Sequence, residues 1–427
     1  MLKNDSIQES ATLVGFKGKE GGSIIKADPL DELQSLAESA GARIECKVLQ
    51  DSRKADPAFF ITKGKVFELK ELVEKKKSDV VIFNEELSPA QQRNLEDFLG
   101  AKVVDRTGLI LDIFAQRARS REGKLQIELA QLNYIMPRLS GRGIEMSRLG
   151  GGIGTRGPGE TKLEMDRRKI KERVLRIKKE LLKVRNTRTV QRFSRKRRFQ
   201  YPAVLVGYTN AGKSTLLNRL TNANVSVESR LFSTLDPTTR RMRLSGGNEI
   251  LLSDTVGFID KLPHQLIQAF KATLEEVREA KLLLHVIDAG SPLIEEHITS
   301  VDRVLEEIGI REKDTIYILN KTDSIKDRSL IKFWSRKLEP VAAVSAKTGE
   351  GMDALYECLG RWVSRKTPKV YFKLPLSERR CIDRIIKSGK IFYKECHGND
   401  MLIEALIDYK LAHNLRRFTV PSFEKTG

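Results

Sequence analysis

The sequence predicts a multidomain α/β protein, and three observations support this prediction. The chain has 427 residues, which is too long for a single hydrophobic core. Apolar runs of strand length alternate with helical patterns over residues 1–115 and 201–365, as is typical of parallel sheets covered by helices. Residues 116–200 show helical periodicity alone. Residues 366–427 combine strand-like runs with a helical pattern, so a small α+β domain is expected there.

The first segment predicts a small α/β domain with a parallel sheet. Strands are expected at 12–16, 58–61 and 80–83, and helices at 30–40 and 66–76. The segment contains no complete phosphate-binding loop, so its sequence does not support nucleotide binding there.

The second segment predicts two long helices that pair antiparallel, a helical hairpin. Its apolar residues recur at helical spacing, and those of the second helix follow a coiled-coil seam. They are Leu125, Leu129, Leu132 and Met136, then Ile170, Val174, Ile177, Leu181 and Val184. The glycine-rich stretch 148–160 lies between the helices, and Thr161 with Glu164 predicts a capping box that starts the second helix. A helix of about 26 residues spans roughly 39 Å, so this loop would project well beyond the body.

The hairpin is strongly basic. Residues 161–200 hold 17 lysines and arginines against 4 acidic residues, out of a net charge of +20 for the chain. Such a segment attracts RNA, DNA or an anionic membrane surface, although a solvated helix face is the alternative. Six glycines in the thirteen residues 148–160 are typical of a flexible linker. Because Arg148 and Arg156 lie within them, a probe that enters a narrow RNA cavity is the preferred interpretation.

The third segment contains a phosphate-binding loop of the form G-x-x-x-x-G-K-S. An apolar strand, 203–206, enters it and a helical pattern, 214–220, leaves it, which argues against an ordinary glycine turn. Its backbone amides would cradle phosphates, its lysine would reach the β and γ oxygens, and its serine would ligate magnesium. The residues are Gly207, Tyr208, Thr209, Asn210, Ala211, Gly212, Lys213 and Ser214.

A second motif, Asp254-Thr255-Val256-Gly257, follows the predicted strand 250–252. The Asp254 carboxylate would lie near the magnesium, and the Gly257 amide would meet the γ-phosphate. Phe258 comes next, where many nucleotide switches place the glutamine that orients the attacking water. No other catalytic residue can be assigned from sequence, so slow intrinsic hydrolysis is expected.

Two further motifs indicate that the base is guanine. They are Asn320-Lys321-Thr322-Asp323 and Ser345-Ala346-Lys347, and each follows an apolar strand. The Asp323 carboxylate can accept two hydrogen bonds from the guanine edge, whereas adenine would leave it unpaired. Asn320 and Lys321 would orient the loop and cover the base. Together the four motifs predict a P-loop GTPase domain that binds GTP and GDP.

The remaining switch segment is harder to place. The stretch Phe232-Ser233-Thr234-Leu235-Asp236 offers Thr234 for the magnesium and γ-phosphate contact, with Thr238 as the second choice. A simple surface turn capped by Asp236 and the following proline is the alternative. Asn210 is a candidate for holding potassium, on resemblance to other GTPases alone.

The motifs and the glycine-rich stretch together resemble the HflX family of ribosome-associated GTPases. The resemblance rests on Gly150–Arg168, Gly207–Thr215 and Asp254–Phe258. It implies binding to the large ribosomal subunit, a hairpin tip directed toward the peptidyl-transferase centre, and splitting of stalled or idle 70S ribosomes. It also supports Thr234 as a magnesium ligand. The candidate RNA contacts are Arg148, Gly151, Gly154, Arg156, Arg167 and Arg168.

The composition indicates where in the cell the protein is expected to work. The four cysteines form no C-x-x-C pair, the five histidines form no cluster with metal-ligand spacing, and no run of 18 apolar residues occurs. A monomeric cytoplasmic protein is expected, with peripheral membrane contact left open. Two alternative functions are a GTP-dependent partner in RNA modification and a GTP-regulated RNA or membrane-surface binder without a splitting role.

Overall fold

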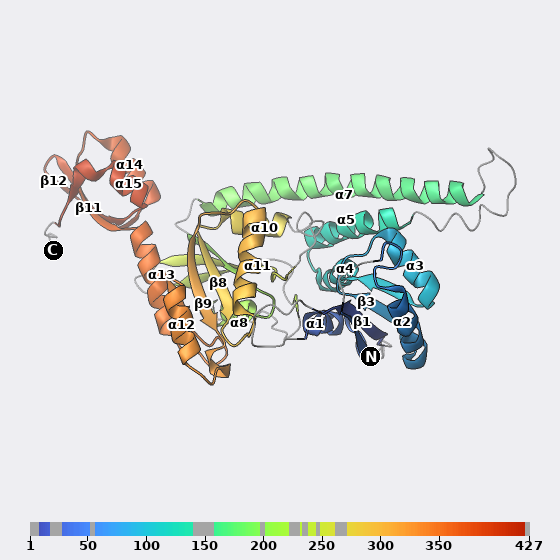
Figure 1. Ribbon diagram of the computed structural model, residues 1–427. Coiled ribbons are helices and arrows are strands. Elements are labelled where there is room, and N and C mark those ends of the chain that lie inside the picture. The colour runs from blue at the N-terminus through green and yellow to red at the C-terminus, as the bar shows by residue number, and fades with distance from the viewer. Residues whose placement is uncertain are drawn as a thin grey trace, which may run out of the picture.

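The computed structural model describes residues 8–17, 28–51, 56–139, 158–196, 201–221, 231–232, 238–244, 248–260 and 271–422. Figure 1 shows their arrangement: two α/β domains lie side by side, a long helix runs along them, and a small domain lies at the far end. The multidomain α/β fold predicted from the sequence is therefore confirmed.

The N-terminal domain is a four-stranded, all-parallel sheet with strand order β2-β1-β3-β4. Alternate strand residues point to opposite faces, so α1 and α4 cover one face while α2 and α3 cover the other. The strands are β1 (Ser10–Phe16), β2 (Arg43–Gln50), β3 (Val80–Phe83) and β4 (Lys102–Asp105), and the helices are α1 (Asp31–Ala40), α2 (Lys63–Lys76), α3 (Pro89–Leu99) and α4 (Arg106–Arg117).

One predicted strand of this domain is wrong. Residues 58–61 form a turn closed by an isolated bridge between Asp56 and Phe60. The Phe60 ring packs edge-on against Phe16 and Phe83, so the apolar run fills space beside the sheet instead of joining it. Strand β2 was not predicted, because this edge strand is half-exposed and carries charged residues along its length.

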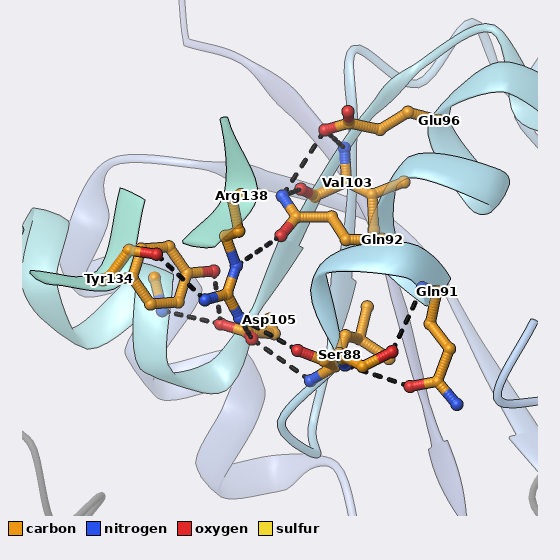
Figure 2. A network of polar contacts seen from close by, with 10 residues as sticks. Ser88, Gln91, Gln92, Glu96, Val103, Asp105, Tyr134 and Arg138 are labelled. Carbon is orange, nitrogen blue, oxygen red and sulfur yellow. Dashed lines mark hydrogen bonds and ion pairs between the residues drawn. The ribbon is translucent and has the colours of Figure 1, made fainter. Parts of the chain in front are cut away.

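A buried carboxylate ties the hairpin to this domain (Figure 2). Asp105 is fully buried, and its oxygens accept hydrogen bonds from the Gly108 amide, the Tyr134 hydroxyl and the Arg138 guanidinium, at 2.8, 2.8 and 2.9 Å. The Arg138 guanidinium also stacks on the Tyr134 ring, 3.6 Å from its centroid. Because Tyr134 and Arg138 lie in the last turns of the first hairpin helix, this network fixes the loop-side end of that helix to the N-terminal domain.

The hairpin helices are α5 (Arg121–Arg138) and α7 (Pro158–Lys196). Ion pairs Arg173–Glu128 and Arg121–Glu180, at 2.6 and 3.1 Å, set them antiparallel as predicted. The capping box is wrong, because α7 starts at Pro158 and Thr161 lies inside it. At 39 residues α7 is also longer than expected, about 58 Å. It extends past both ends of α5 (Figure 1).

The central domain has a six-stranded sheet in the order β10-β9-β8-β5-β7-β6, in which β6 is antiparallel and the other strands are parallel. Apolar clusters fill both faces of this sheet. Its elements are β5 (Tyr201–Val206), α8 (Lys213–Thr221), β6 (Thr239–Arg243), β7 (Glu249–Asp254), α10 (Lys271–Glu279), β8 (Leu282–Asp288), α11 (Ile294–Glu307), β9 (Asp314–Asn320), η2 (Thr322–Ser324), α12 (Ser329–Lys337), β10 (Val341–Ala343) and α13 (Met352–Lys366).

The C-terminal domain is a four-stranded antiparallel sheet in the order β12-β13-β11-β14, with helices packed on one face. This agrees with the α+β prediction. Its elements are β11 (Lys369–Pro375), α14 (Arg379–Ser388), β12 (Lys390–His397), β13 (Asp400–Leu406), α15 (Tyr409–Asn414), η3 (Arg416–Phe418) and β14 (Thr419–Val420).

Candidate guanine-nucleotide site

The phosphate-binding loop joins β5 to α8, as its flanking patterns predict. Two of its glycines have no room for a side chain. A Cβ on Gly207 would lie 2.2 Å from the Val286 carbonyl oxygen, and a Cβ on Gly212 would lie 2.2 Å from Asn320 Nδ2. Both glycines also have positive φ angles, 151° and 93°, which L-residues with side chains rarely adopt. The loop can therefore hold its main chain close to the neighbouring strand ends.

Lys213 begins α8 and is buried beneath the loop. Its ammonium donates to the carbonyl oxygens of Gly207 and Tyr208, at 3.1 and 2.8 Å. Burial lowers the pKa of Lys213 to about 8, although the nearby Asp254 carboxylate opposes this effect. A buried cation of this kind is stabilised when a phosphate binds beside it.

Two of the residues expected at the magnesium position, Ser214 and Asp254, lie together. The Ser214 hydroxyl donates to Asp254 Oδ2 at 2.6 Å, and both residues are buried where β7 ends beside the loop. The Thr255 amide donates to the other carboxylate oxygen at 2.9 Å, which fixes its orientation. A hydroxyl and a carboxylate beside a phosphate site are the oxygen donors that magnesium prefers, so the residues fit this ion.

The two base motifs are hydrogen-bonded to each other and to the phosphate loop. Asn320 donates to the Ala211 carbonyl at 2.8 Å and accepts from the Ala346 amide at 3.0 Å. The Ser345 hydroxyl donates to Asp323 Oδ1 at 2.6 Å, which orients that carboxylate. Lys321 forms an ion pair with Asp288 at 2.8 Å. These bonds bring three of the four predicted motifs together at the carboxyl edge of the sheet, and the Ser214–Asp254 bond adds the fourth. This is the edge at which open α/β sheets bind ligands.

Two threonines of these motifs have unsatisfied hydroxyls. Thr209 Oγ1 and Thr322 Oγ1 are buried and make no hydrogen bond with any residue that the structure describes. A buried polar atom without a partner is costly. Both hydroxyls belong to predicted nucleotide motifs, so their state fits a site that is completed by a polar ligand.

The segment after β7 lies directly on the phosphate loop. The Phe258 amide donates to the Gly207 carbonyl at 3.1 Å, and its carbonyl accepts from the Thr209 amide at 2.7 Å. A Cβ on Gly257 would lie 2.7 Å from Thr209 Cγ2. The Phe258 side chain is buried in an apolar cluster and has no polar atom, so it cannot orient a water molecule.

The N-terminal domain contacts this site at Tyr208 of the phosphate loop. The Tyr208 hydroxyl donates to Glu32 at 2.6 Å and accepts from the Asp260 amide at 2.9 Å. Arg106 donates to the same Glu32 carboxylate at 2.9 Å and to the Asp260 carbonyl at 3.0 Å. The Tyr208 ring stacks on His297, with 3.8 Å between centroids. Glu32, Arg106 and His297 belong to no motif, so none of them was predicted as a site residue.

The first switch segment also meets the N-terminal domain. Phe232 is buried with a positive φ of 57°, and its ring lies 4.6 Å from that of Phe114 on α4. The Leu231 amide donates to the Ser39 hydroxyl on α1 at 3.0 Å. Three structural elements of the nucleotide site thus touch the N-terminal domain: the phosphate loop and both segments around the γ-phosphate position.

Several predicted site residues lie outside the described residues. They are Ser233, Thr234, Leu235 and Asp236 of the switch segment and Arg148, Gly151, Gly154 and Arg156 of the hairpin loop. Thr238, the second choice for magnesium, lies beside β6, and its carbonyl accepts from the Asp254 amide at 3.0 Å. Arg167 and Arg168 lie on α7, where Arg168 pairs with Glu172 at 3.3 Å.

Comparison with known proteins decides the family. Three family models match in succession: "GTP-binding GTPase N-terminal" over residues 27–115, "GTP-binding GTPase Middle Region" over 117–195, and "50S ribosome-binding GTPase" over 202–321. GTPase HflX of Caldanaerobacter subterraneus is 47% identical over 92% of this chain and 90% of its own length. The chain belongs to the HflX family of GTPases. GTPase HflX of Escherichia coli K12 is 46% identical over 84% of each chain.

The protein is accordingly a GTP-binding and GTP-hydrolysing enzyme of a ribosome-associated family. Among solved structures, a GTP-binding protein from Sulfolobus solfataricus in complex with GDP is 27% identical, with a TM-score of 0.43 over 83% of this chain and 98% of that chain. Within the described residues, no helix is long and apolar enough to cross a membrane.

Proposed function

We propose that this HflX-family GTPase binds the large ribosomal subunit and splits stalled or idle 70S ribosomes. The observation that carries the proposal is α7. This helix of 39 residues ends at Lys196, and β5, which leads into the phosphate-binding loop, begins at Tyr201. Only four residues therefore separate a basic arm from the strand that leads into a nucleotide switch.

The outward face of α7 suits a polyanion such as ribosomal RNA. Its apolar seam packs against α5, whereas its other faces carry exposed cations. Cations on one rigid rod attract a phosphate backbone over several turns. The exposed basic residues in the part of α7 whose side chains are described include Arg168, Lys171, Arg176, Lys178 and Lys179.

The candidate nucleotide contacts divide into three groups. The loop 207–214 would cradle the phosphates, Asn320–Asp323 and Ser345–Lys347 would hold the guanine, and Phe232–Asp236 with Asp254–Gly257 would respond to the γ-phosphate. Ser214 and Thr234 would ligate magnesium, with Asp254 beside them, and the ion would neutralise phosphate charge when bound. Asn210 would contribute to a potassium site.

GTP would act here through binding, and hydrolysis would permit release. The ordered switch segments favour attachment to the subunit, and the inserted hairpin competes with the joined ribosome. Phe258 leaves the attacking water without an orienting side chain, so the ribosome would supply that positioning. The measurement is GTP turnover with and without purified large subunits. Acceleration of at least tenfold is expected, and an unchanged rate would contradict the proposal.

The glycine-rich loop is tested by its removal. Deleting residues 150–159 should leave GTP affinity intact and abolish the dissociation of 70S ribosomes on sucrose gradients. A variant in which the same residues are replaced by a glycine-serine stretch of equal length is the matched control for a simple linker. If that variant still splits ribosomes, the loop sequence has no role in splitting.

The alternative function, a GTP-regulated RNA or membrane-surface binder, predicts that the protein will associate with a different partner. With a non-hydrolysable GTP analogue, co-migration with large subunits supports ribosome binding, whereas pelleting with anionic vesicles supports the alternative.

Exchange of potassium for sodium at constant ionic strength tests the proposed ion at Asn210, since slower turnover of GTP is expected in sodium.

A further inference from the structure

Helix α14 of the C-terminal domain has two very different faces. Ile382 and Ile385 are buried in the apolar core of that domain. The opposite face carries four exposed cations, here called the α14 basic face: Arg379, Arg380, Arg384 and Lys387. None of the four forms an ion pair with a carboxylate among the residues that the structure describes. Asp383 is the acidic residue on this face.

The placement of these cations is not explained by the stability of the helix. Arg379 and Arg380 occupy the first turn of α14, which holds no acidic residue. The amino end of a helix carries partial positive charge, so two arginines there oppose the helix dipole. A local arrangement that works against stability, and that no internal partner compensates, is expected at functional surfaces.

Helix η3 lies beside the amino end of α14. Arg417 of η3 pairs with Glu378, the residue before α14, at 3.3 Å, and its guanidinium lies 4.5 Å from the Phe418 ring centroid. Arg416 beside it is exposed. Because Glu378 already has a cation partner in Arg417, it does not neutralise the α14 basic face.

We propose that the α14 basic face binds the phosphate backbone of ribosomal RNA as a second anchor, separate from the hairpin. The proposal rests on the proposed function. Guanidinium groups present paired donors that match phosphate oxygens, and exposed arginines on successive turns can follow a backbone. A bilayer is disfavoured as the partner, because insertion requires exposed apolar side chains and α14 contributes no exposed large apolar residue.

The position of α14 gives a second anchor a physical advantage. In Figure 1 the C-terminal domain lies at one end of the molecule, and the N-terminal domain with the tip-ward end of α7 lies at the other. Two contacts on one rigid surface reinforce each other, because the first raises the effective concentration of the second. Loss of either contact therefore weakens attachment without abolishing it.

The test uses the full chain with Arg379→Gln, Arg380→Gln and Arg384→Gln combined. With a non-hydrolysable GTP analogue, its affinity for purified large subunits should fall at least tenfold. The slope of log affinity against log salt should become shallower by about 2 to 3, since each lost phosphate contact removes about 0.7 to 0.9. The triple lysine variant, which keeps the charge, should retain most of the affinity, and GTP binding should not change in either variant.

Lys332→Gln with Arg336→Gln, two exposed cations on α12, is the matched control and should bind subunits like the unmodified protein. If the triple-glutamine variant binds large subunits as tightly as this control does, the inference is overturned, whereas the proposed function stands. A defect confined to anionic vesicles would also overturn it, in favour of a membrane contact. If the unmodified protein fails to bind large subunits, the proposed function fails and this inference fails with it.

Discussion

Asp323 is the single residue that we expect to set the choice of nucleotide. Its carboxylate is oriented by the Ser345 hydroxyl, 2.6 Å away, and can accept from two donors on the guanine edge. An amide in its place offers one acceptor and one donor, so one guanine donor would face another donor.

We therefore expect Asp323→Asn to weaken GTP binding at least tenfold, since a hydrogen bond to a charged group contributes about 1.5–3 kcal/mol. Xanthosine triphosphate carries a carbonyl where guanine has an amino group, so the variant should bind it more tightly than GTP. Isothermal titration calorimetry with both nucleotides checks the prediction. An unchanged preference for GTP would show that Asp323 does not contact the base.

Lys213 predicts a proton linkage to GTP binding. Burial lowers the pKa of Lys213 to about 8 in the free protein, and phosphates beside the ammonium should raise it. GTP binding should therefore take up close to one proton near pH 9, and the uptake should vanish toward pH 7, where Lys213 is already protonated. Calorimetry in two buffers of different ionisation enthalpy measures this uptake. Equal heats in both buffers at pH 9 would contradict it.

The same residue links pH to stability. The folded pKa of Lys213 lies below its usual value of 10.5, so the unfolded chain binds more protons between about pH 8 and 10.5. The contribution of Lys213 to stability thus rises with pH across this window. Below pH 8 the group opposes folding of the nucleotide-free protein, and bound phosphate relieves that opposition.

The sequence indicates these two residues as candidates but gives no sign of their neighbours. Lys213 and Asp323 belong to motifs whose spacing follows from the shape of a nucleotide. Glu32 and Arg106 carry no such spacing, because they meet Tyr208 and Asp260 only after two domains pack together. What distinguishes these two residues is that their charges are buried between domains, and burial cannot be recognised from a single sequence.

At the scale of elements, the seam between α5 and α7 decides whether the arm is rigid. Ile177 is fully buried at its centre, whereas Leu182, one turn beyond, is 59% exposed on the other side of α7. The ion pair Arg173–Glu128 is half-exposed, so it adds little beyond orientation.

Ile177→Ala should therefore lower the free energy of unfolding by about 2–5 kcal/mol, the range for truncating a buried aliphatic side chain. Leu182→Ala, which makes the same chemical change on the exposed face, should alter it by less than about 0.5 kcal/mol. Urea unfolding followed by circular dichroism checks both values. Similar losses in the two variants would place the seam elsewhere on α7.

The predicted elements succeed where one face is clearly apolar. Strands β5 and β9 and helix α14 were found from periodicity or from continuous apolar runs. The start of α7 was misplaced because a capping pattern at Thr161 competes with the proline at 158, and proline is well suited to the first turn. Residues 58–61 were misassigned because a short apolar run can either form a strand or pack against a sheet without joining it.

At the scale of the whole molecule, Arg106 joins the two α/β domains. It is 6% exposed and donates to Glu32, to Asn84 and to the Asp260 carbonyl of the central domain. The same apolar cluster runs through both domains, from α1 and α4 to the segments around Phe232 and Phe258. This interface is therefore a direct physical connection between the nucleotide site and the N-terminal domain.

Arg106→Ala should lower the free energy of unfolding by about 2–3 kcal/mol, less than for a fully buried pair because Glu32 is 30% exposed. It should also broaden thermal unfolding, since the domains lose their shared charge contact. Arg303→Ala is the control: Arg303 is 61% exposed and lies 4.0 Å from Asp260, so its loss should have almost no effect. Equal losses of unfolding free energy in the two variants would mean that the buried contacts of Arg106 stabilise the protein no more than the exposed Arg303 pair does.

The length of α7 has a mechanical consequence. The helix spans about 58 Å and its last turn leads through four residues into the strand that carries the phosphate loop. It therefore has the geometry of a lever arm that is joined to the central domain at the amino end of β5, across the sheet from the nucleotide motifs. A rotation of about 5° at that end would displace the other end by about 5 Å, close to one helical turn. A small tilt of the strand that follows α7 would thereby be amplified at the far end of the helix into a movement on the scale of a nucleotide.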